Sequence, residues 1–239
     1  KPDPKKSQAG AATKPVERVL VIQLGALVPF VQALAAAKRI RDFHVGARIT
    51  VLTTEATREL AEKCPYFDAV ESDGKPTEPQ AITKLITRIR AAKYDFVYDL
   101  EGSSRTSNYF QGLRPWPPNW SGPVAGASHR YADAEREQLH PLDRYAAQLE
   151  VAGLGVGGAL VPELGWLRSV LRNPPRLQPD FFGIRGPYVL LLPRGAEAEA
   201  GRAWPREKYI ELARRIVRHG VTPVVLGGVE DRPIGAAIA

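Results

Sequence analysis

The sequence predicts an α/β protein built on parallel, doubly wound sheets. Short runs that are apolar at every position alternate with longer stretches in which apolar residues recur at helical spacing. A run without polar positions fits a parallel strand that is buried on both faces. Alternation of such runs with helices is the pattern of βαβ units, whose right-handed crossovers place helices on both sides of the sheet.

We expect a leader and a first domain in the amino-terminal part of the chain. Residues 1–15 are rich in Lys, Pro, Ala and Gly, which predicts a disordered leader before the domain of residues 16–155. The strands predicted in that domain are 19–22, 48–52, 67–70 and 94–99. The helices predicted in it are 30–43, 54–63, 78–92 and 141–152. Thr54 is the expected N-cap of the second helix, and residues 112–122, rich in Pro and Gly, are expected to form a rigid loop.

A second domain is expected after a linker. Residues 156–186 contain many Gly and Pro residues and show little periodicity, which predicts a connection between domains. A new βαβ unit then follows, with strands at 188–192 and 221–226 and a helix at 205–219 that has proline in its first turn. Because one βαβ unit cannot bury both faces of its sheet, residues 187–239 are interpreted as the start of a larger, incomplete domain.

Composition limits the compartment. The 239 residues are 44% hydrophobic and 25% charged, as in an ordinary soluble globular protein. The single cysteine, Cys64, excludes an internal disulfide and suits a reducing compartment. No apolar run approaches the roughly 20 residues that span a bilayer, and the polar N-terminus lacks the apolar core of a signal peptide. We therefore expect a cytoplasmic protein in peripheral contact with the inner membrane.

The net charge of +7 favours anionic partners, namely phosphates, acidic lipid surfaces or nucleic acid. The basic residues are spread through the predicted helices, so an ordinary solvated surface explains them equally well. We expect no nucleic-acid partner, because basic and aromatic residues do not interleave on one face. No cluster of His and Cys suggests a metal site, and no cofactor is expected.

Candidate ligand sites follow from the predicted sheets. In open parallel sheets ligands bind outside the carboxyl ends of the strands, which here selects the loops after residues 23, 53, 99, 192 and 226. The first of these loops is no G-x-G-x-x-G fingerprint, and the chain has no Walker A sequence. Arg194, Gly195 and Arg202 precede a helix start, as in a phosphate site, or are exposed arginines on a mobile loop. His140 and Arg144 flank another helix start, where capping and ion pairing are an equal explanation.

Seven segments together resemble the family-nine glycosyltransferases, the heptosyltransferases of lipopolysaccharide core synthesis. They read "VLVIQLGALVPF" (19–30), "ARITVLTT" (47–54), "CPYFDAV" (64–70), "YDFVYDLEGSSRTS" (94–107), "LHPLDRYAAQL" (139–149), "RAWPREKYIELARRI" (202–216) and "PVVLGGVED" (223–231). The resemblance covers residues 18–239. It implies a GT-B fold of two Rossmann-like domains, with the acceptor side in the first and the nucleotide-sugar in the second. The family's later Asp-x-Gly-x-x-His motif does not occur within these residues.

The resemblance also implies an activity and its residues. The expected reaction is inverting transfer of a heptose from an ADP-sugar to an anionic glycolipid acceptor. The donor-side residues carried over are Arg194, Gly195, Arg202 and Glu230. The acceptor-side residues carried over are Gly25, Arg105, His140 and Arg144.

The position of the family's catalytic base is the exception, because Val28 and Pro29 stand where the family has Gly-Asp. Proline cannot accept a proton, and of the acids in the first domain only Asp99 and Glu101 are candidates to replace the base. Two interpretations therefore stay open: a glycosyltransferase that uses another base, and a non-catalytic GT-B relative that serves as a binding or assembly scaffold.

Overall fold

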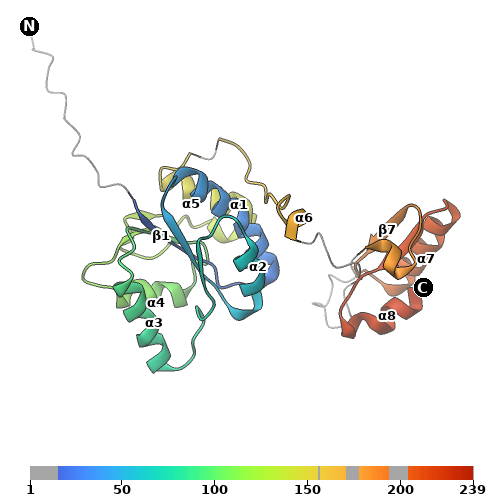
Figure 1. Ribbon diagram of the computed structural model, residues 1–239, viewed down its shortest axis with the longest axis horizontal. Coiled ribbons are helices and arrows are strands. Elements are labelled where there is room, and N and C mark those ends of the chain that lie inside the picture. The colour runs from blue at the N-terminus through green and yellow to red at the C-terminus, as the bar shows by residue number, and fades with distance from the viewer. Residues whose placement is uncertain (1–15, 156, 171–177, 194–203, 239) are drawn as a thin grey trace, which may run out of the picture. The chain divides into compact units, whose positions relative to one another are not determined.

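The computed structural model describes residues 16–155, 157–170, 178–193 and 204–238. The chain divides into two compact units, Lys1–Val170 and Leu171–Ala239 (Figure 1). Each unit contains parallel strands with α-helices packed against them. The predicted α/β fold with parallel sheets is confirmed.

The first unit is built on a six-stranded sheet with the order β3-β2-β1-β4-β5-β6, and every neighbouring pair of strands is parallel. The strands are β1 (Arg18–Ile22), β2 (Arg48–Leu52), β3 (Ala69–Glu71), β4 (Phe96–Asp99), β5 (Asn119–Gly122) and β6 (His129–Arg130). Strand β1 lies between β2 and β4. This order is that of the Rossmann fold, and it reverses direction between β1 and β4.

Helices cover both faces of this sheet. They are α1 (Leu27–Phe43), α2 (Arg58–Lys63), α3 (Pro79–Ala91), α4 (Ser104–Gly112), α5 (Pro141–Val151) and the short α6 (Leu167–Val170), with 3-10 turns at η1 (Glu55–Thr57) and η2 (Arg136–Gln138). Helices α1, α2 and α5 lie on one side of the sheet, and α3 and α4 lie on the other (Figure 1).

The apolar composition of β1 is explained by the helices that cover both faces of the sheet. Val19 and Val21 belong to the core cluster formed with α1 and α5, whereas Leu20 and Ile22 belong to the cluster formed with α3 and α4. All four side chains are at most 1% exposed. Since full burial of such a side chain contributes about 1.5–3 kcal/mol, a polar residue at any of the four positions would be strongly destabilising.

Three local features differ from the sequence-based expectation. Thr54 makes no capping hydrogen bond, and the helix predicted from that position is split into η1 and α2. Part of the predicted rigid loop, Asn119–Gly122, is instead strand β5, which pairs with β4 and buries Trp120 completely. Helix α4 was not predicted, although Ser103 and Thr106 form a capping box at its start.

The stretch predicted as a linker is divided between the two units, and its described residues pack within the unit to which they belong. Leu164 and Trp166 pack against the cluster that contains Phe30, and the Tyr66 hydroxyl donates to the carbonyl of Glu163 (3.0 Å). Farther along, Phe182 lines a pocket of the second unit. Low periodicity therefore indicated the lack of long elements here, but it did not indicate a lack of packing.

The described residues of the second unit form a two-stranded parallel sheet and two α-helices. Its elements are η4 (Pro179–Phe182), β7 (Tyr188–Leu191), α7 (Arg206–Arg218), β8 (Thr222–Val225), η5 (Val229–Asp231) and α8 (Arg232–Ile238). Leu191, Ala213 and Ile238 form its core between the sheet and the helices. The side chain of Tyr188 is 42% exposed and that of Leu190 is 47% exposed.

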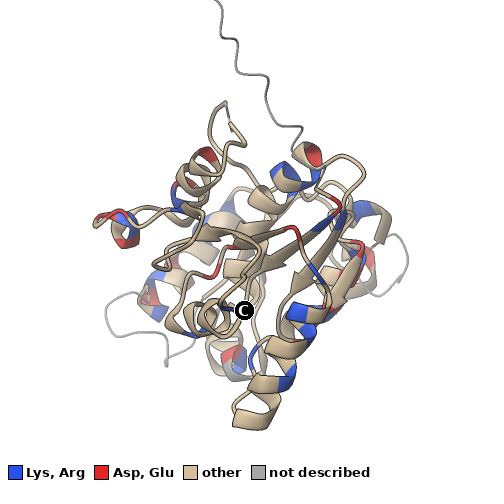
Figure 2. Ribbon diagram, turned by 90° about the vertical axis from the view of Figure 1, so that its left-hand side faces the viewer, with Lys and Arg blue, Asp and Glu red and all other residues tan. Residues whose placement is uncertain are grey.

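Charged residues of both signs are interspersed along the helices (Figure 2). Several cations pair with an acid four residues away, for example Lys38 with Asp42 (2.8 Å) and Arg58 with Glu62 (2.7 Å). Such exposed pairs each contribute little to stability. Among the described residues, no helix is both long and apolar enough to cross a membrane.

Candidate functional site

The strand order reverses between β1 and β4, and Rossmann-like sheets bind ligands outside the carboxyl ends of the strands at such a switch point. The loops that follow these two strands are tied together. The amides of Leu100 and Glu101 both donate to the carbonyl of Ile22, at 3.0 and 3.1 Å. The Glu101 Oε2 atom in turn accepts a hydrogen bond from the Leu24 amide (3.1 Å). The carboxylate of Glu101 is thereby fixed beside the first loop.

The first loop is shaped by Gln23 and Gly25. The Gly25 amide donates to Gln23 Oε1 (2.6 Å), and Gln23 Nε2 donates to the Tyr145 hydroxyl (3.1 Å). A β-carbon on residue 25 would stand 2.8 Å from Pro29 Cβ and 2.9 Å from Gln23 Oε1. Glycine is therefore required here, which gives Gly25 a structural role at the predicted acceptor side.

Pro29 is the third residue of α1 and is exposed. The amide that proline lacks would have no partner within the helix at this position, so the substitution does not disturb the first turn. Leu27 (55% exposed) and Val28 (64% exposed) precede it. The exposed side chains in the first turn of α1 are thus apolar, and none of them can accept a proton.

The two replacement acids have very different surroundings. Asp99 is completely buried, and burial raises the pKa of its carboxyl to about 6, against the effect of the hydrogen bond from the Gly102 amide. That bond (2.8 Å) uses Oδ1, whereas Oδ2 has no hydrogen-bond partner among the described residues. Glu101 is partly exposed. Because Asp99 is completely buried, it is not accessible to the hydroxyl of a sugar acceptor. The partly exposed Glu101 is therefore the better candidate for the base.

Two cations hydrogen-bond to backbone carbonyls, one of them in the first loop. Arg105 Nη1 donates to the Pro76 carbonyl (2.6 Å), and Lys75 Nζ donates to the Leu24 carbonyl (3.4 Å). Arg105 also lines a pocket of about 400 Å³ between α3 and α4, together with Ser104 and Asn108. Sequence reasoning selected Arg105 but missed Lys75, whose position over the first loop no local pattern indicates.

The predicted cluster at the start of α5 separates into two parts. His140 is exposed, and its Nδ1 accepts a hydrogen bond from the Leu142 amide (3.3 Å), so it acts as the helix cap. Arg144 lies with its guanidinium carbon 5.7 Å from the centre of the Tyr145 ring, and its Nε is enclosed. The structure adds Arg136, a buried arginine in η2 that sequence reasoning did not identify.

Most of the predicted donor residues cannot be placed. Arg194, Gly195 and Arg202 lie outside the described residues, and Glu230 lies within η5, which follows β8 after a short turn that contains the glycine pair. Asp231 is a further acid at this edge, and its Oδ2 accepts from the Gly228 amide (2.9 Å). Its other oxygen has no hydrogen-bond partner among the described residues. The spacing of Asp231 after the glycine pair is a capping signal that could have identified it.

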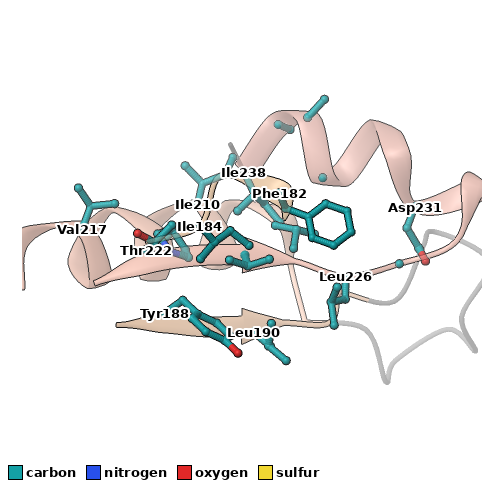
Figure 3. Close-up of a pocket in the computed structure, with 18 of the residues that line it drawn as sticks. Phe182, Ile184, Tyr188, Leu190, Ile210, Val217, Thr222, Leu226, Asp231 and Ile238 are labelled. Carbon is teal, nitrogen blue, oxygen red and sulfur yellow. The ribbon is translucent and has the colours of Figure 1, made fainter. Parts of the chain in front are cut away.

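A largely apolar pocket of about 1360 Å³ opens in the second unit. Figure 3 shows Phe182, Ile184 and Ile238 on the helical side of its strands, with Asp231 at the end near Leu226. The glycines that follow β8 also line it, so the pocket reaches the carboxyl end of that strand, where a ligand is expected in a parallel sheet. Within the described residues, no group of three or more His, Cys, Asp and Glu side chains is placed to hold a metal ion.

Comparison with known proteins supports this picture. A family 9 glycosyl transferase of Veillonella parvula superposes with a TM-score of 0.73 at 20% identity, covering 94% of this chain and 67% of that one. The chain has the fold of glycosyltransferase family 9. The sequence-based resemblance is thus confirmed at the level of fold.

Two solved heptosyltransferases share this family 9 fold. E. coli ADP-heptose lipopolysaccharide heptosyltransferase II has a TM-score of 0.67 at 20% identity, over 92% of this chain and 67% of its own. E. coli heptosyltransferase WaaC with ADP-2-deoxy-2-fluoro heptose has a TM-score of 0.62 at 16% identity, over 93% and 73%.

Sequence comparison adds one relative. A Haemophilus influenzae protein, provisionally described as a glycosyltransferase, is 31% identical over 121 residues, which are 51% of this chain and 32% of the relative. The chain therefore spans about a third of that relative's length. No protein-family model matches the sequence.

Proposed function

We propose that the protein is a glycosyltransferase that transfers a heptose from an ADP-sugar to an anionic glycolipid acceptor of the lipopolysaccharide core type, in peripheral contact with the inner membrane. The observation that carries this proposal is the carboxylate of Glu101, fixed to the first loop at the switch point of a family 9 fold. One solved relative with this fold holds an ADP-heptose analogue, which supports the choice of donor.

The proposed reaction makes one bond and breaks one. The acceptor hydroxyl attacks the anomeric carbon of the heptose, and the bond between that carbon and the diphosphate breaks with inversion. ADP leaves with the electron pair, and the hydroxyl proton passes to a base. The protein must therefore supply a proton acceptor beside the hydroxyl and positive charge beside the departing diphosphate.

Glu101 is our candidate for the proton acceptor. Its Oε2 is held by the Leu24 amide, while its Oε1 accepts no hydrogen bond from the described residues. A carboxylate that is held through one oxygen and is partly exposed can accept a proton from the hydroxyl of a bound acceptor through its other oxygen. Lys75 donates to the carbonyl of Leu24, whose amide holds Glu101, and Arg105 lies in the first turn of α4; both would provide positive charge for an anionic acceptor.

Pro29 supports a second candidate function, a non-catalytic scaffold that keeps ligand binding but not transfer. The first turn of α1 offers no proton acceptor, and its exposed residues are apolar. In that case the fold would still bind ADP and a glycan, and it would act through assembly with other proteins.

Measurement of ADP release separates the two. The full-length protein, incubated with ADP-heptose and a heptose-free lipopolysaccharide acceptor, is expected to release ADP, and Glu101→Gln is expected to slow release by about 10²- to 10⁴-fold. Glu59→Gln is the matched control, because Glu59 is exposed on α2 and pairs only with Lys63. ADP binding by calorimetry without any release would favour the scaffold. Release that Glu101→Gln leaves unchanged would remove Glu101 from the mechanism.

A further inference from the structure

Asp99 is a fully buried carboxyl residue at the end of β4, two positions before Glu101. Its Oδ1 atom accepts a hydrogen bond from the Gly102 amide (2.8 Å), whereas Oδ2 has no hydrogen-bond partner among the described residues. Burial of a carboxyl with one oxygen unpaired is unfavourable. Residues that break the rule of paired burial are expected at functional sites, so the surroundings of Asp99 call for a functional explanation.

The hydrogen bond from Gly102 closes a turn that contains Glu101. The amides of Leu100 and Glu101 both donate to the carbonyl of Ile22, which holds the turn on its amino-terminal side. The Asp99 carboxyl holds the turn on its other side, through the amide of Gly102. The backbone of Glu101 is therefore fixed from both directions, and of these three bonds only the one to Asp99 involves a side chain.

The position of the Glu101 carboxylate depends on this turn. Its Oε2 accepts a hydrogen bond from the Leu24 amide (3.1 Å), and such a bond weakens steeply when its geometry is disturbed. A displacement of about 1 Å at a reacting group can lower a rate by about 10²-fold. Without the carboxyl of Asp99, the Gly102 end of the turn would lose its anchor, and the carboxylate of Glu101 would no longer have one fixed position.

Asp99 is itself a rigid point of attachment. Its backbone carbonyl accepts a hydrogen bond from Gln148 Nε2 (3.0 Å), and it pairs with Ile22 in the register of β4 and β1. A β-carbon on Gly122 would stand only 3.0 Å from the Asp99 Cβ, so β5 packs closely against this side chain. The carboxyl can therefore transmit the order of the sheet to the turn.

We infer that Asp99 is a positioning residue: through the Gly102 amide it fixes the turn from which Glu101 reaches the first loop. It does not accept the proton of the acceptor, because it is completely buried. The part that Glu101 plays in transfer rests on the proposed function. The hold of Asp99 on Glu101 does not, because it can be measured without any substrate.

Hydrogen exchange of the Leu24 amide measures this hold, in nitrogen-15 NMR spectra of the full-length protein. The Val21 amide in β1 serves as the reference for changes in overall stability. Asp99→Leu keeps the branched shape of the side chain but removes the acceptor. We expect it to lower the protection of Leu24 relative to Val21 by about tenfold, the effect of one lost hydrogen bond. Asp99→Asn, whose amide oxygen can still accept from Gly102, should keep the protection.

Asp95→Leu is the matched control. Asp95 directly precedes β4, and its Oδ2 accepts hydrogen bonds from the amides of Glu17 and Arg18, each at 2.9 Å. Its loss should lower the free energy of unfolding without changing the protection of Leu24 relative to the reference. If Asp99→Leu does not fold, Asp99→Ala takes its place with the same expected result.

Transfer provides the second readout. With ADP-heptose and acceptor, Asp99→Leu should lower the kcat for ADP release by about 10²-fold and leave the KM for ADP-heptose unchanged, because the variant disturbs the base and not the donor site. Asp99→Asn should restore most of the rate. A residue with a general structural role would not show this rescue together with an unchanged KM.

The outcomes are distinguishable. A Leu24 amide that keeps its relative protection without the Asp99 carboxyl would overturn the inference, whatever the rates are. An equal loss of protection in Asp95→Leu or in Asp99→Asn would also overturn it, because the effect would then be a general one. Loss of protection confined to Asp99→Leu, in a protein that releases no ADP, would support the hold on Glu101 and contradict only the proposed function.

Discussion

The guanidinium of Arg136 occupies the space in which a side chain on Gly102 would lie. Nη2 stands 2.2 Å from the position of the absent β-carbon. Gly102 also has a φ of +62°, a left-handed conformation that favours glycine. The backbone conformation therefore favours glycine at residue 102, and the Arg136 guanidinium would have to move for any larger side chain.

Gly102→Ala separates these two requirements. The backbone strain should cost about 1–2 kcal/mol, whereas the arginine, being the flexible end of a long side chain, should move aside. Gly46→Ala is the matched control, because Gly46 has a φ of +83° with no atom within 4 Å of its β-carbon position. We expect similar losses in the free energy of unfolding for the two variants by urea denaturation. Only Gly102→Ala should shift the Arg136 Nε–H signal, and an unshifted signal would contradict the contact.

Asp99 should make the protein less stable as the pH rises. Burial raises the pKa of its carboxyl in the folded state to about 6 from an ordinary value of 3.8. Between these values the folded state binds more protons than the unfolded state, so the free energy of unfolding falls with increasing pH. The loss is complete above pH 6 and amounts to about 3 kcal/mol at 1.36 kcal/mol per pH unit.

Asp99→Asn removes this titration. Urea denaturation from pH 4 to pH 7 should show that the wild-type protein loses stability relative to the variant over this range. The Asn side chain can still accept the bond from the Gly102 amide, so the local turn is kept. A constant difference in stability between the two proteins across the range would show that Asp99 titrates normally.

Restoration of the family sequence in the first loop should raise activity. Val28→Gly with Pro29→Asp places a carboxylate at the exposed first turn of α1, where the family has its base. In the Glu101→Gln background, which lacks the proposed base, this change should raise ADP release in the presence of acceptor by about 10²- to 10⁴-fold. Val28→Gly with Pro29→Asn is the control without a base. Equal rates for the Asp and Asn variants would show that proton removal is not limiting.

Arg202 is expected to contact the diphosphate of the donor, as the sequence resemblance implies. One charge-assisted hydrogen bond is worth roughly 1.5–3 kcal/mol, so Arg202→Ala in the full-length protein should weaken ADP binding by about ten- to a hundredfold. Isothermal titration calorimetry measures this directly, with the exposed Arg206→Ala as the control. Unchanged ADP affinity would exclude Arg202 from the donor site.

The parts of the fold that sequence predicted are those with strong local signals. Strand β1 is apolar at four successive positions because both of its faces are covered, and that pattern is visible in the letters alone. Strand β5 was missed because its residues, Asn-Trp-Ser-Gly, carry no strand pattern and are held by pairing with β4. Local propensity was overruled there by a tertiary contact.

The candidate site shows the same limit. Gly25 and Glu101 were selected as candidates because they follow predicted strands, and the rule for parallel sheets points to such loops. Arg136 was missed because its neighbours, Gly102 and Arg144, are brought to it by the fold and not by the sequence. Burial of a charge results from three-dimensional packing, and the spacing of residues along this chain does not predict it.

The double cover of β1 also determines when the protein can fold during synthesis. One face of this early strand packs on α5, through Tyr145 and Leu149, which the ribosome makes late in the synthesis of the first unit. The partner strand β4 likewise arrives only after β2 and β3. Until those segments emerge, the most apolar strand of the sheet has no lasting partner on one edge and one face, and contacts this distant in sequence form slowly. The nascent chain must therefore keep β1 shielded, by a chaperone or by transient collapse, through most of the translation of its first unit.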